Sequence, residues 1–298
     1  FESEVRGDFE GVGMEIGIRD GVLTVVTPLK NTPADRAGLQ SGDSIIAING
    51  EDTRGLGVEA AVIKIRGERG TPVVFTILRG NEAPFEATVI RDTITLPTLE
   101  TELKDGDVFI IRLFGFNAIA PQLFRNAVRE FAESGTNKLI IDLRGNPGGF
   151  LEVAVDMASW FLPVGKTIVI EDHNDESLNI VHRSRGYNVF TDQLKLVILI
   201  NQGSASASEI FAGALSEYGK ATLIGETSFG KGSVQQVFPV TDTTSLKITI
   251  ARWLTPNGNS ISNGGITPDI EVALTAEDRE ALRDPQLDRA VEFLRTGQ

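Results

Sequence analysis

Short runs of alternating apolar and polar residues dominate the first third of the chain. Gly, Pro, Asn and Asp separate these runs, which cover residues 13–18, 22–27, 44–48 and 73–78. The pattern predicts short β-strands. Two helical segments interrupt them, at 33–38 and 57–65, and each ends near a glycine. We therefore expect a β-rich domain over 9–92, preceded at 1–8 by the end of another segment.

A different pattern begins near Asp107, where continuous apolar runs alternate with helical periodicity. The runs predict buried strands at 108–113, 138–143 and 194–200, and the periodicity predicts helices at 120–134, 151–161 and 206–218. Repeated strand–turn–helix units are typical of a mainly parallel sheet. Further strands are expected at 222–225 and 245–251. The sequence thus predicts an α/β domain over 93–275 and a charged helical tail over 276–298.

Composition and charge exclude several classes of function. The chain has 298 residues, which favours two domains. Its net charge of −13 argues against a nucleic-acid binder and against an anionic membrane surface. It has no cysteine, which removes disulfides and thiolate chemistry. The only histidines, His173 and His182, form no zinc motif, so we expect no catalytic metal.

A serine-rich segment lies between the predicted strand 194–200 and the helix that follows. A serine at a helix entry has free backbone N–H groups beside it, which suit a nucleophile and an oxyanion. The alternative is structural, because Ser206 with Glu209 fits a capping box. Ser204 and Ser208 are close by and leave the choice of serine open. This segment alone favours a capping role.

Lys231 lies between two glycines, shortly after the predicted strand 222–225. Glycines permit close backbone approach and can aim a lysine inward. A lysine activates a serine if desolvation keeps its amine neutral, and the sequence offers no cysteine or well-placed histidine for that task. The alternative is a solvated turn lysine. A phosphate loop is disfavoured, because Gly232 stands where that motif needs Ser or Thr.

The sequence DLRGNPGG at residues 142–149 forms a third Gly-rich turn after a predicted strand. Gly148 and Gly149 could present backbone N–H groups to a developing anion. The alternative is a plain turn in which Asp142 and Arg144 only brace the backbone.

Five motifs in this order resemble the carboxy-terminal processing peptidases, or tail-specific proteases, which use a serine–lysine pair. They are GVGMEIG at 11–17, DLRGNPGG at 142–149, GSASASE at 203–209, GETSFGKGSVQ at 225–235 and GITPD at 265–269. The resemblance runs from about residue 8 to residue 272. It implies a mixed α/β fold with a mainly parallel sheet in a ClpP/crotonase-like protease core, together with a β-rich PDZ domain.

The resemblance also implies a catalytic site. Ser206 becomes the nucleophile, Lys231 the base, and Gln235 the residue that orients the lysine, with Glu217 as a weaker candidate for that last role. The oxyanion would bind the backbone N–H groups of Ala207 and Gly148, with Gly149 as a further donor. No metal or organic cofactor is expected.

The front domain resembles a PDZ domain, on GVGM at 11–14, PADRAGL at 33–39 and GDSIIAING at 42–50. The resemblance implies that the N–H groups of Val12, Gly13 and Met14 bind the C-terminal carboxylate of a peptide that adds as an extra strand. Alone, the Gly-x-Gly pair would be only a hairpin feature. Arg66 is a candidate for coupling the two domains, although most such arginines are merely solvated.

The expected partners are proteins or peptides with accessible C-termini, and not nucleic acid. A regulatory protein and a homo-oligomer are left open. Relatives usually carry a helical segment before the PDZ domain, and only residues 1–8 stand there in this chain. An extracytoplasmic location is expected from the family, although the chain holds no export signal. The rival functions are a catalytically silent PDZ scaffold and a carrier of carboxylated lipids or retinoids.

Overall fold

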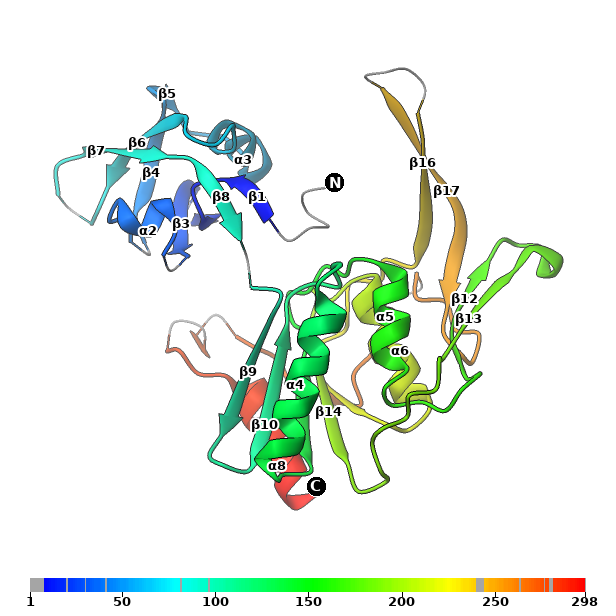
Figure 1. Cartoon of the computed structure of the whole chain (residues 1–298). Coiled ribbons are helices and arrows are strands. Elements are labelled where there is room, and N and C mark those ends of the chain that lie inside the picture. Colours follow the sequence, from blue (N-terminus) through cyan, green and yellow to red (C-terminus); the bar gives the residue numbers. More distant parts are fainter. Residues whose placement is uncertain are drawn as a thin grey trace. The chain divides into compact units, whose positions relative to one another are not determined.

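The chain divides into two compact units, Phe1–Leu96 and Pro97–Gln298 (Figure 1). The structure is a computed structural model that describes residues 8–19, 21–29, 31–40, 42–80, 82–95, 97–239, 244–262, 264–275, 277–278 and 281–297. The sequence predicted a boundary after residue 92, and the structure has it a few residues later, after Leu96. The reason is that β8 (Asp92–Thr95) pairs antiparallel with β1 (Asp8–Gly11) and so belongs to the first unit.

The first unit is built on an antiparallel sheet of order β2-β3-β4-β6-β7, with β5 paired to β4. The strands are β2 (Met14–Arg19), β3 (Val22–Pro28), β4 (Ser44–Ile48), β5 (Glu51–Asp52), β6 (Pro72–Leu78) and β7 (Phe85–Ile90). Its described residues include the helices α2 (Pro33–Arg36) and α3 (Val58–Ile65). Inward side chains such as Val25, Ile45 and Phe75 are fully buried, as the alternating pattern predicts.

The main sheet of the second unit has the order β18-β15-β14-β11-β10-β9. Its strands are β9 (Leu99–Lys104), β10 (Val108–Leu113), β11 (Lys138–Asp142), β14 (Lys195–Ile200), β15 (Thr222–Gly225) and β18 (Ile270–Glu271). Every pairing is parallel except that of β9 with β10. The predicted mixed α/β fold with a mainly parallel sheet is therefore confirmed.

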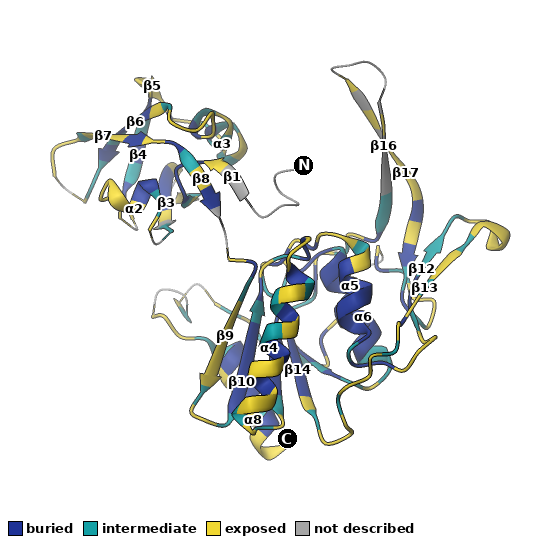
Figure 2. Cartoon of the chain, in the orientation of Figure 1, coloured by how far each residue is buried: buried dark blue, intermediate teal, exposed yellow. Residues whose placement is uncertain are grey.

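Helices cover both faces of this sheet. Helices α4 (Ala120–Ser134), α5 (Leu151–Ala158) and α6 (Ala207–Glu217) share one apolar core with the strand side chains that point to one face of the sheet. Helices α5 and α6 are buried along most of their length (Figure 2). The alternate strand residues pack against α8 (Pro285–Thr296). The expected tail at 276–298 is therefore corrected: its helix is part of the core, because it buries a stripe of apolar residues against the sheet.

A second, antiparallel sheet has the order β13-β12-β17-β16. Its strands are β12 (Thr167–Asp172), β13 (Ile180–Arg183), β16 (Ser233–Pro239) and β17 (Ser245–Leu254), and the 3-10 helix η1 (Glu176–Leu178) lies between the first two. Of these strands the sequence predicted only β17. The other three were missed because polar and charged residues interrupt their apolar pattern.

Two adjacent parallel strands place the site. The last residue of β11, Asp142, pairs with Leu199 near the end of β14. The loops that follow the two strands therefore leave the same edge of the sheet side by side. Ligands of such sheets lie outside the carboxyl ends of the strands.

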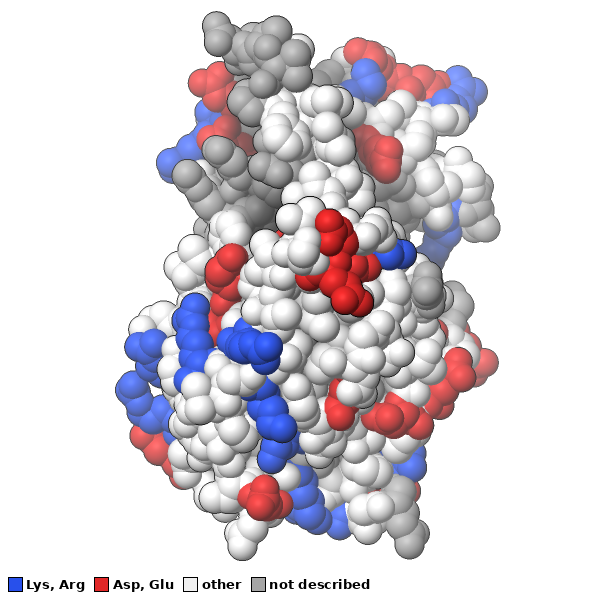
Figure 3. Space-filling view, turned by 90° about the vertical axis from the view of Figure 1, so that its right-hand side faces the viewer, with Lys and Arg blue, Asp and Glu red and all other residues white. Residues whose placement is uncertain are grey.

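The surface carries charge of both signs. On the face drawn in Figure 3, Lys and Arg side chains lie in small groups among acidic and uncharged residues, instead of merging into one basic surface. In the described parts of the chain, no helix combines the length and apolar character needed to cross a membrane.

Candidate active site

Ser206 is the N-cap of α6, directly after the turn that leaves β14. Its backbone has φ 57° and ψ −115°, whereas an ordinary N-cap serine is extended. A non-glycine residue with positive φ is uncommon, and such strain concentrates at functional sites. A strained strand-to-helix turn is also how nucleophile elbows expose a serine hydroxyl. The predicted capping box with Glu209 is present as well, so the helix cap and the strained backbone occur together at Ser206.

The structure gives a physical reason to distinguish the three serines, a choice that the segment left open and the family resemblance made for Ser206. Ser204 and Ser208 are fully buried, and their hydroxyls donate to the carbonyl oxygens of Leu143 at 2.8 Å and Asn146 at 2.9 Å. Ser206 is only half-buried. The two flanking serines therefore join the turn to the loop after β11, and Ser206 alone of the three can meet a substrate.

The loop after β11 lies against the Ser206 turn. At Gly148, φ is 102°, and a Cβ would be 2.6 Å from the Ala205 carbonyl oxygen and 2.9 Å from Ser206 Cβ. Only glycine permits this approach. Asn146 sets the loop: its buried side chain donates to the Leu113 carbonyl at 2.7 Å and accepts from the Gly148 N–H at 2.9 Å.

The hydrogen bonds decide which backbone N–H groups are available for an oxyanion. Among the described residues, the N–H groups of Ala207 and Gly149 have no partner, whereas that of Gly148 is taken by Asn146. At Gly149, φ is 145°, and a Cβ would be 2.4 Å from the Phe116 carbonyl oxygen. The pair with free N–H groups is thus Ala207 and Gly149 and not the expected Ala207 and Gly148, because Asn146 occupies the Gly148 N–H.

Glu209 joins the serine turn to the lysine loop. Its carboxylate is almost fully buried and accepts four hydrogen bonds. The donors are the N–H groups of Ser206 at 2.8 Å, Gly230 at 2.7 Å and Lys231 at 3.0 Å, and the Ser228 hydroxyl at 2.6 Å. One oxygen binds both the Ser206 and the Lys231 N–H, so these two nitrogens lie within about 6 Å of each other. The two motifs therefore meet at one carboxylate.

The amine of Lys231 is not sheltered in this structure. The residue is exposed, and its amine has no hydrogen-bond partner in the part of the chain that the structure describes. Of the two alternatives for the Lys231 side chain, desolvated or solvated, the structure therefore shows the solvated one. The physical reason is that the loop brings only the backbone of Lys231 into the buried Glu209 cluster and leaves the side chain outside.

The two candidates for orienting the lysine have different positions. Gln235 lies on strand β16, and its side chain lies outside the described part of the structure. Glu217 is at the far end of α6, about 16 Å along the helix axis from Ser206. Its carboxylate accepts from Thr255, Asn257 and Asn259 at 2.6 to 2.9 Å. Glu217 therefore cannot orient the lysine.

The two histidines belong to another region. His173 follows β12, and His182 lies on β13 with its Nε2 3.4 Å from the Glu171 carboxylate. Among the described residues, no group of three or more His, Cys, Asp or Glu side chains could hold a metal ion.

In the first unit, the residues expected to bind a carboxylate form a constrained loop. Gly13 has φ 73° and a Cβ there would be 2.4 Å from Thr32 Cβ, whose hydroxyl donates to the Gly13 carbonyl at 2.7 Å. The N–H groups of Val12 and Gly13 have no partner among the described residues. Met14 begins β2, an edge strand of the sheet. The loop can therefore offer free donors beside an open strand edge.

Family models identify both units. The model of peptidase family S41 matches residues 107–272, and the PDZ domain model matches residues 4–78. The chain belongs to peptidase family S41. The family resemblance seen in the five motifs is thereby confirmed.

Curated relatives agree with this assignment. The carboxy-terminal processing protease CtpA of Bacillus subtilis is 35% identical over 92% of this chain, and the carboxy-terminal-processing protease of Bartonella bacilliformis is 37% identical over 90%. This chain spans 58% and 62% of their lengths.

Solved structures share the fold. The photosystem II D1 C-terminal processing protease is similar with a TM-score of 0.62 and 26% identity, covering 90% of this chain and 73% of that one. A putative S41 protease from Bacteroides fragilis has a TM-score of 0.64 at 18% identity, covering 97% and 84%, which shows likeness of fold alone.

Sequence reasoning missed two residues of this S41 site. Glu209 was read only as half of a capping box, although it also binds three donors in the loop at 228–231. Asn146 was not singled out, although its side chain and carbonyl connect the loop after β11 to β10 and to the serine turn. The only sequence signal for either was that a polar residue lies inside one of the motifs, Asn146 in DLRGNPGG and Glu209 in GSASASE.

Proposed function

We propose that this chain is a serine endopeptidase in which Ser206 and Lys231 form the catalytic pair and the PDZ domain binds the C-termini of substrates. The observation that carries the proposal is the Glu209 carboxylate. It binds the N–H groups of both Ser206 and Lys231, and so it brings two motifs that are far apart in the sequence to one point. Membership of peptidase family S41 supports the same reaction class.

The proposed reaction uses only side chains and backbone of this chain. The neutral Lys231 amine accepts the proton of Ser206 as Oγ bonds to the carbonyl carbon of the scissile peptide. The Ala207 and Gly149 N–H groups hold the oxyanion. Lys231 returns the proton to the leaving amine as the C–N bond breaks. Water, activated by the same amine, then hydrolyses the ester on Ser206.

Substrate binding would supply the desolvation that the exposed Lys231 amine lacks. Large apolar side chains stand next to the reacting groups in the sequence: Phe229 precedes the lysine by two positions and is 67% exposed, and Phe150 follows Gly149 and is 41% exposed. Apolar side chains of a bound polypeptide would cover these rings and exclude water from the amine. A neutral lysine is favoured where water is excluded.

The proposed role of the first unit follows from its edge strand. A peptide would add to β2 as an extra strand, with its C-terminal carboxylate at the N–H groups of Val12, Gly13 and Met14. The unpartnered N–H groups of Val12 and Gly13 support this assignment.

The test is cleavage of an unstructured protein with an apolar C-terminus. Ser206→Ala and Lys231→Ala should each abolish cleavage while leaving the fold intact. Ser216→Ala on the same helix and Lys220→Ala are matched controls that should cleave normally. Wild-type turnover in either dyad variant would disprove the assignment.

A catalytically silent PDZ scaffold is the second candidate, and the exposure of Lys231 favours it. Such a protein would bind the same substrate with equal affinity in the wild type and in Ser206→Ala, and would leave it intact in both. Cleavage by the wild type excludes this candidate.

A further inference from the structure

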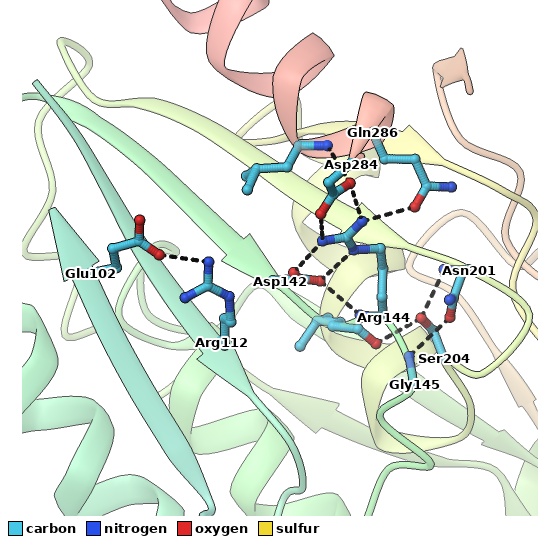
Figure 4. Close-up of polar contacts among 11 residues, drawn as sticks. Glu102, Arg112, Asp142, Arg144, Gly145, Asn201, Ser204, Asp284 and Gln286 are labelled. Atoms are coloured by element: carbon cyan, nitrogen blue, oxygen red, sulfur yellow. Dashed lines mark hydrogen bonds and ion pairs between the residues drawn. The ribbon is translucent and has the colours of Figure 1, made fainter. Parts of the chain in front are cut away.

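Arg144, in the loop after β11, uses every N–H group of its guanidinium (Figure 4). It binds both oxygens of Asp142 at 2.9 and 2.7 Å, and both oxygens of Asp284 at 2.8 Å. The fifth N–H donates to Gln286 Oε1 at 3.0 Å. An arginine has five N–H donors, so its position is fixed completely by three side chains.

Two of those three side chains come from the start of α8. Asp284 is the N-cap of α8 and also accepts from the Leu287 N–H at 3.0 Å. Gln286 is fully buried, and its amide donates to the Val272 carbonyl at 2.8 Å. Because α8 packs on the sheet face opposite α6, this cluster anchors the loop to the back of the sheet.

A few residues after Arg144, the anchored loop contacts the turn that carries Ser206. Gly145, next to Arg144, donates its N–H to Asn201 Oδ1 at 2.9 Å, at the start of the serine turn. Asn146 and Gly148 follow, and Gly148 stands so close to Ser206 that no side chain fits between them. A shift of Arg144 would therefore move the glycines that face Ser206.

The charge of the cluster argues for a role beyond stability. One guanidinium faces two carboxylates, and Arg112 on β10 is the only further cation that acts on Asp284 among the described residues. A buried ion cluster is weak evidence for stability, since well-packed apolar residues often stabilise as much. Bidentate pairs instead fix geometry.

We propose that Asp284 is a positioning residue of the peptidase reaction: through Arg144 it holds the loop at 143–149 so that Gly148 and Gly149 stay in place beside Ser206. This inference rests on the proposed function for the Ser206 site. Asp284 itself contacts no substrate, because it acts through the guanidinium.

The test is Asp284→Asn. Asparagine caps a helix as well as aspartate does, and Arg144 keeps its pair with Asp142, so the fold should persist. We expect kcat to fall between about tenfold and a hundredfold, as for a small misplacement of catalytic groups. KM should change by less than about twofold, because the loss is confined to the transition state. Asp284→Glu keeps the carboxylate, so its kcat should lie between that of Asp284→Asn and that of the wild type.

Asp288→Asn is the matched control. Asp288 lies one turn further along α8, is exposed, and its carboxylate has no bond within the described structure. This variant removes the same charge from the same helix and should keep the wild-type kcat. Unchanged kcat in Asp284→Asn, or equal losses in both variants, would overturn the proposal.

Hydrogen exchange gives a readout that does not require cleavage. Backbone amides of 143–149 should exchange faster in Asp284→Asn, while those of α8 keep their protection. Faster exchange at 143–149 alone would support the positioning role even if the wild type cleaved no substrate. The lack of cleavage would disprove only the proposed function. Exchange that rises equally across the whole second unit, or nowhere, would refute the positioning role.

Discussion

Replacing Gly148 by alanine should lower activity by displacing the serine turn, without removing any catalytic side chain. The new Cβ would lie 2.6 Å from the Ala205 carbonyl oxygen and 2.9 Å from both Ala207 N and Ser206 Cβ. Ordinary contact begins near 3.4 Å, so the loop and the serine turn must part by roughly 0.8 Å. This shift falls directly on the nucleophile and on the Ala207 N–H.

The expected magnitudes follow from that displacement. A misplacement of about 1 Å costs on the order of a hundredfold in rate, so kcat should fall by about that factor or more. The strained dihedral and the overlap should together destabilise the fold by about 2–4 kcal/mol. The assay is kcat on the unstructured substrate, corrected for folded fraction by circular dichroism.

Gly135→Ala isolates the cost of the dihedral. Gly135 also has positive φ, 73°, at the end of α4, but a Cβ there meets nothing within 4 Å. It should lose about 1–2 kcal/mol of stability and no activity. If Gly148→Ala kept the wild-type kcat, catalysis would not depend on the close approach of the loop after β11 to the Ser206 turn.

Three further predictions concern charge and recognition. Glu209→Gln turns one acceptor oxygen into a donor and leaves two N–H or O–H groups unpaired, so the free energy of unfolding should fall by about 2 kcal/mol or more, measured by urea denaturation. Burial alone would raise the pKa of Asp284, but hydrogen bonds from Arg144 and Leu287 outweigh it and hold that pKa below its ordinary value. This contribution to stability is present above the unfolded pKa of about 4 and is lost as pH falls through the folded pKa, so acid unfolding should be shallower in Asp284→Asn than in the wild type. A substrate whose C-terminus is an amide should be cleaved more slowly than the free acid. Equal rates would show that the N–H groups of Val12 and Gly13 do not bind the substrate's carboxylate.

The apolar pattern was sufficient for the interior strands of the first unit's sheet and of the main sheet of the second unit. The runs at 108–113, 138–143 and 194–200 are strands of the main sheet, because a strand buried on both faces reads as continuous apolar sequence. The edges of the sheets were less visible. Strand β9 has the sequence LETELK, which exposes most of its side chains, and it forms only because β10 offers a partner.

The motifs by themselves indicated the family and the catalytic segments. The residues of the serine segment left Ser204, Ser206 and Ser208 open, and only the family resemblance implied Ser206. The physical reason lies in the fold, because the hydroxyls of the outer two serines are used by carbonyls some sixty positions away. For Glu209 the motifs indicated only the capping of α6. The charge pattern of the sequence predicted that the α8 segment is a tail.

The sequence alone therefore determined most of the interior strands and the helices between them, the order of the motifs and the chemistry that those residue types permit, since local periodicity and backbone preferences depend on near neighbours. Only the tertiary structure decided which serine is free, that one buried carboxylate joins the serine turn to the lysine loop, and that α8 braces the glycine loop through Arg144. A buried polar group takes whatever partner the fold brings to it, and here those partners are up to 142 positions apart in the chain.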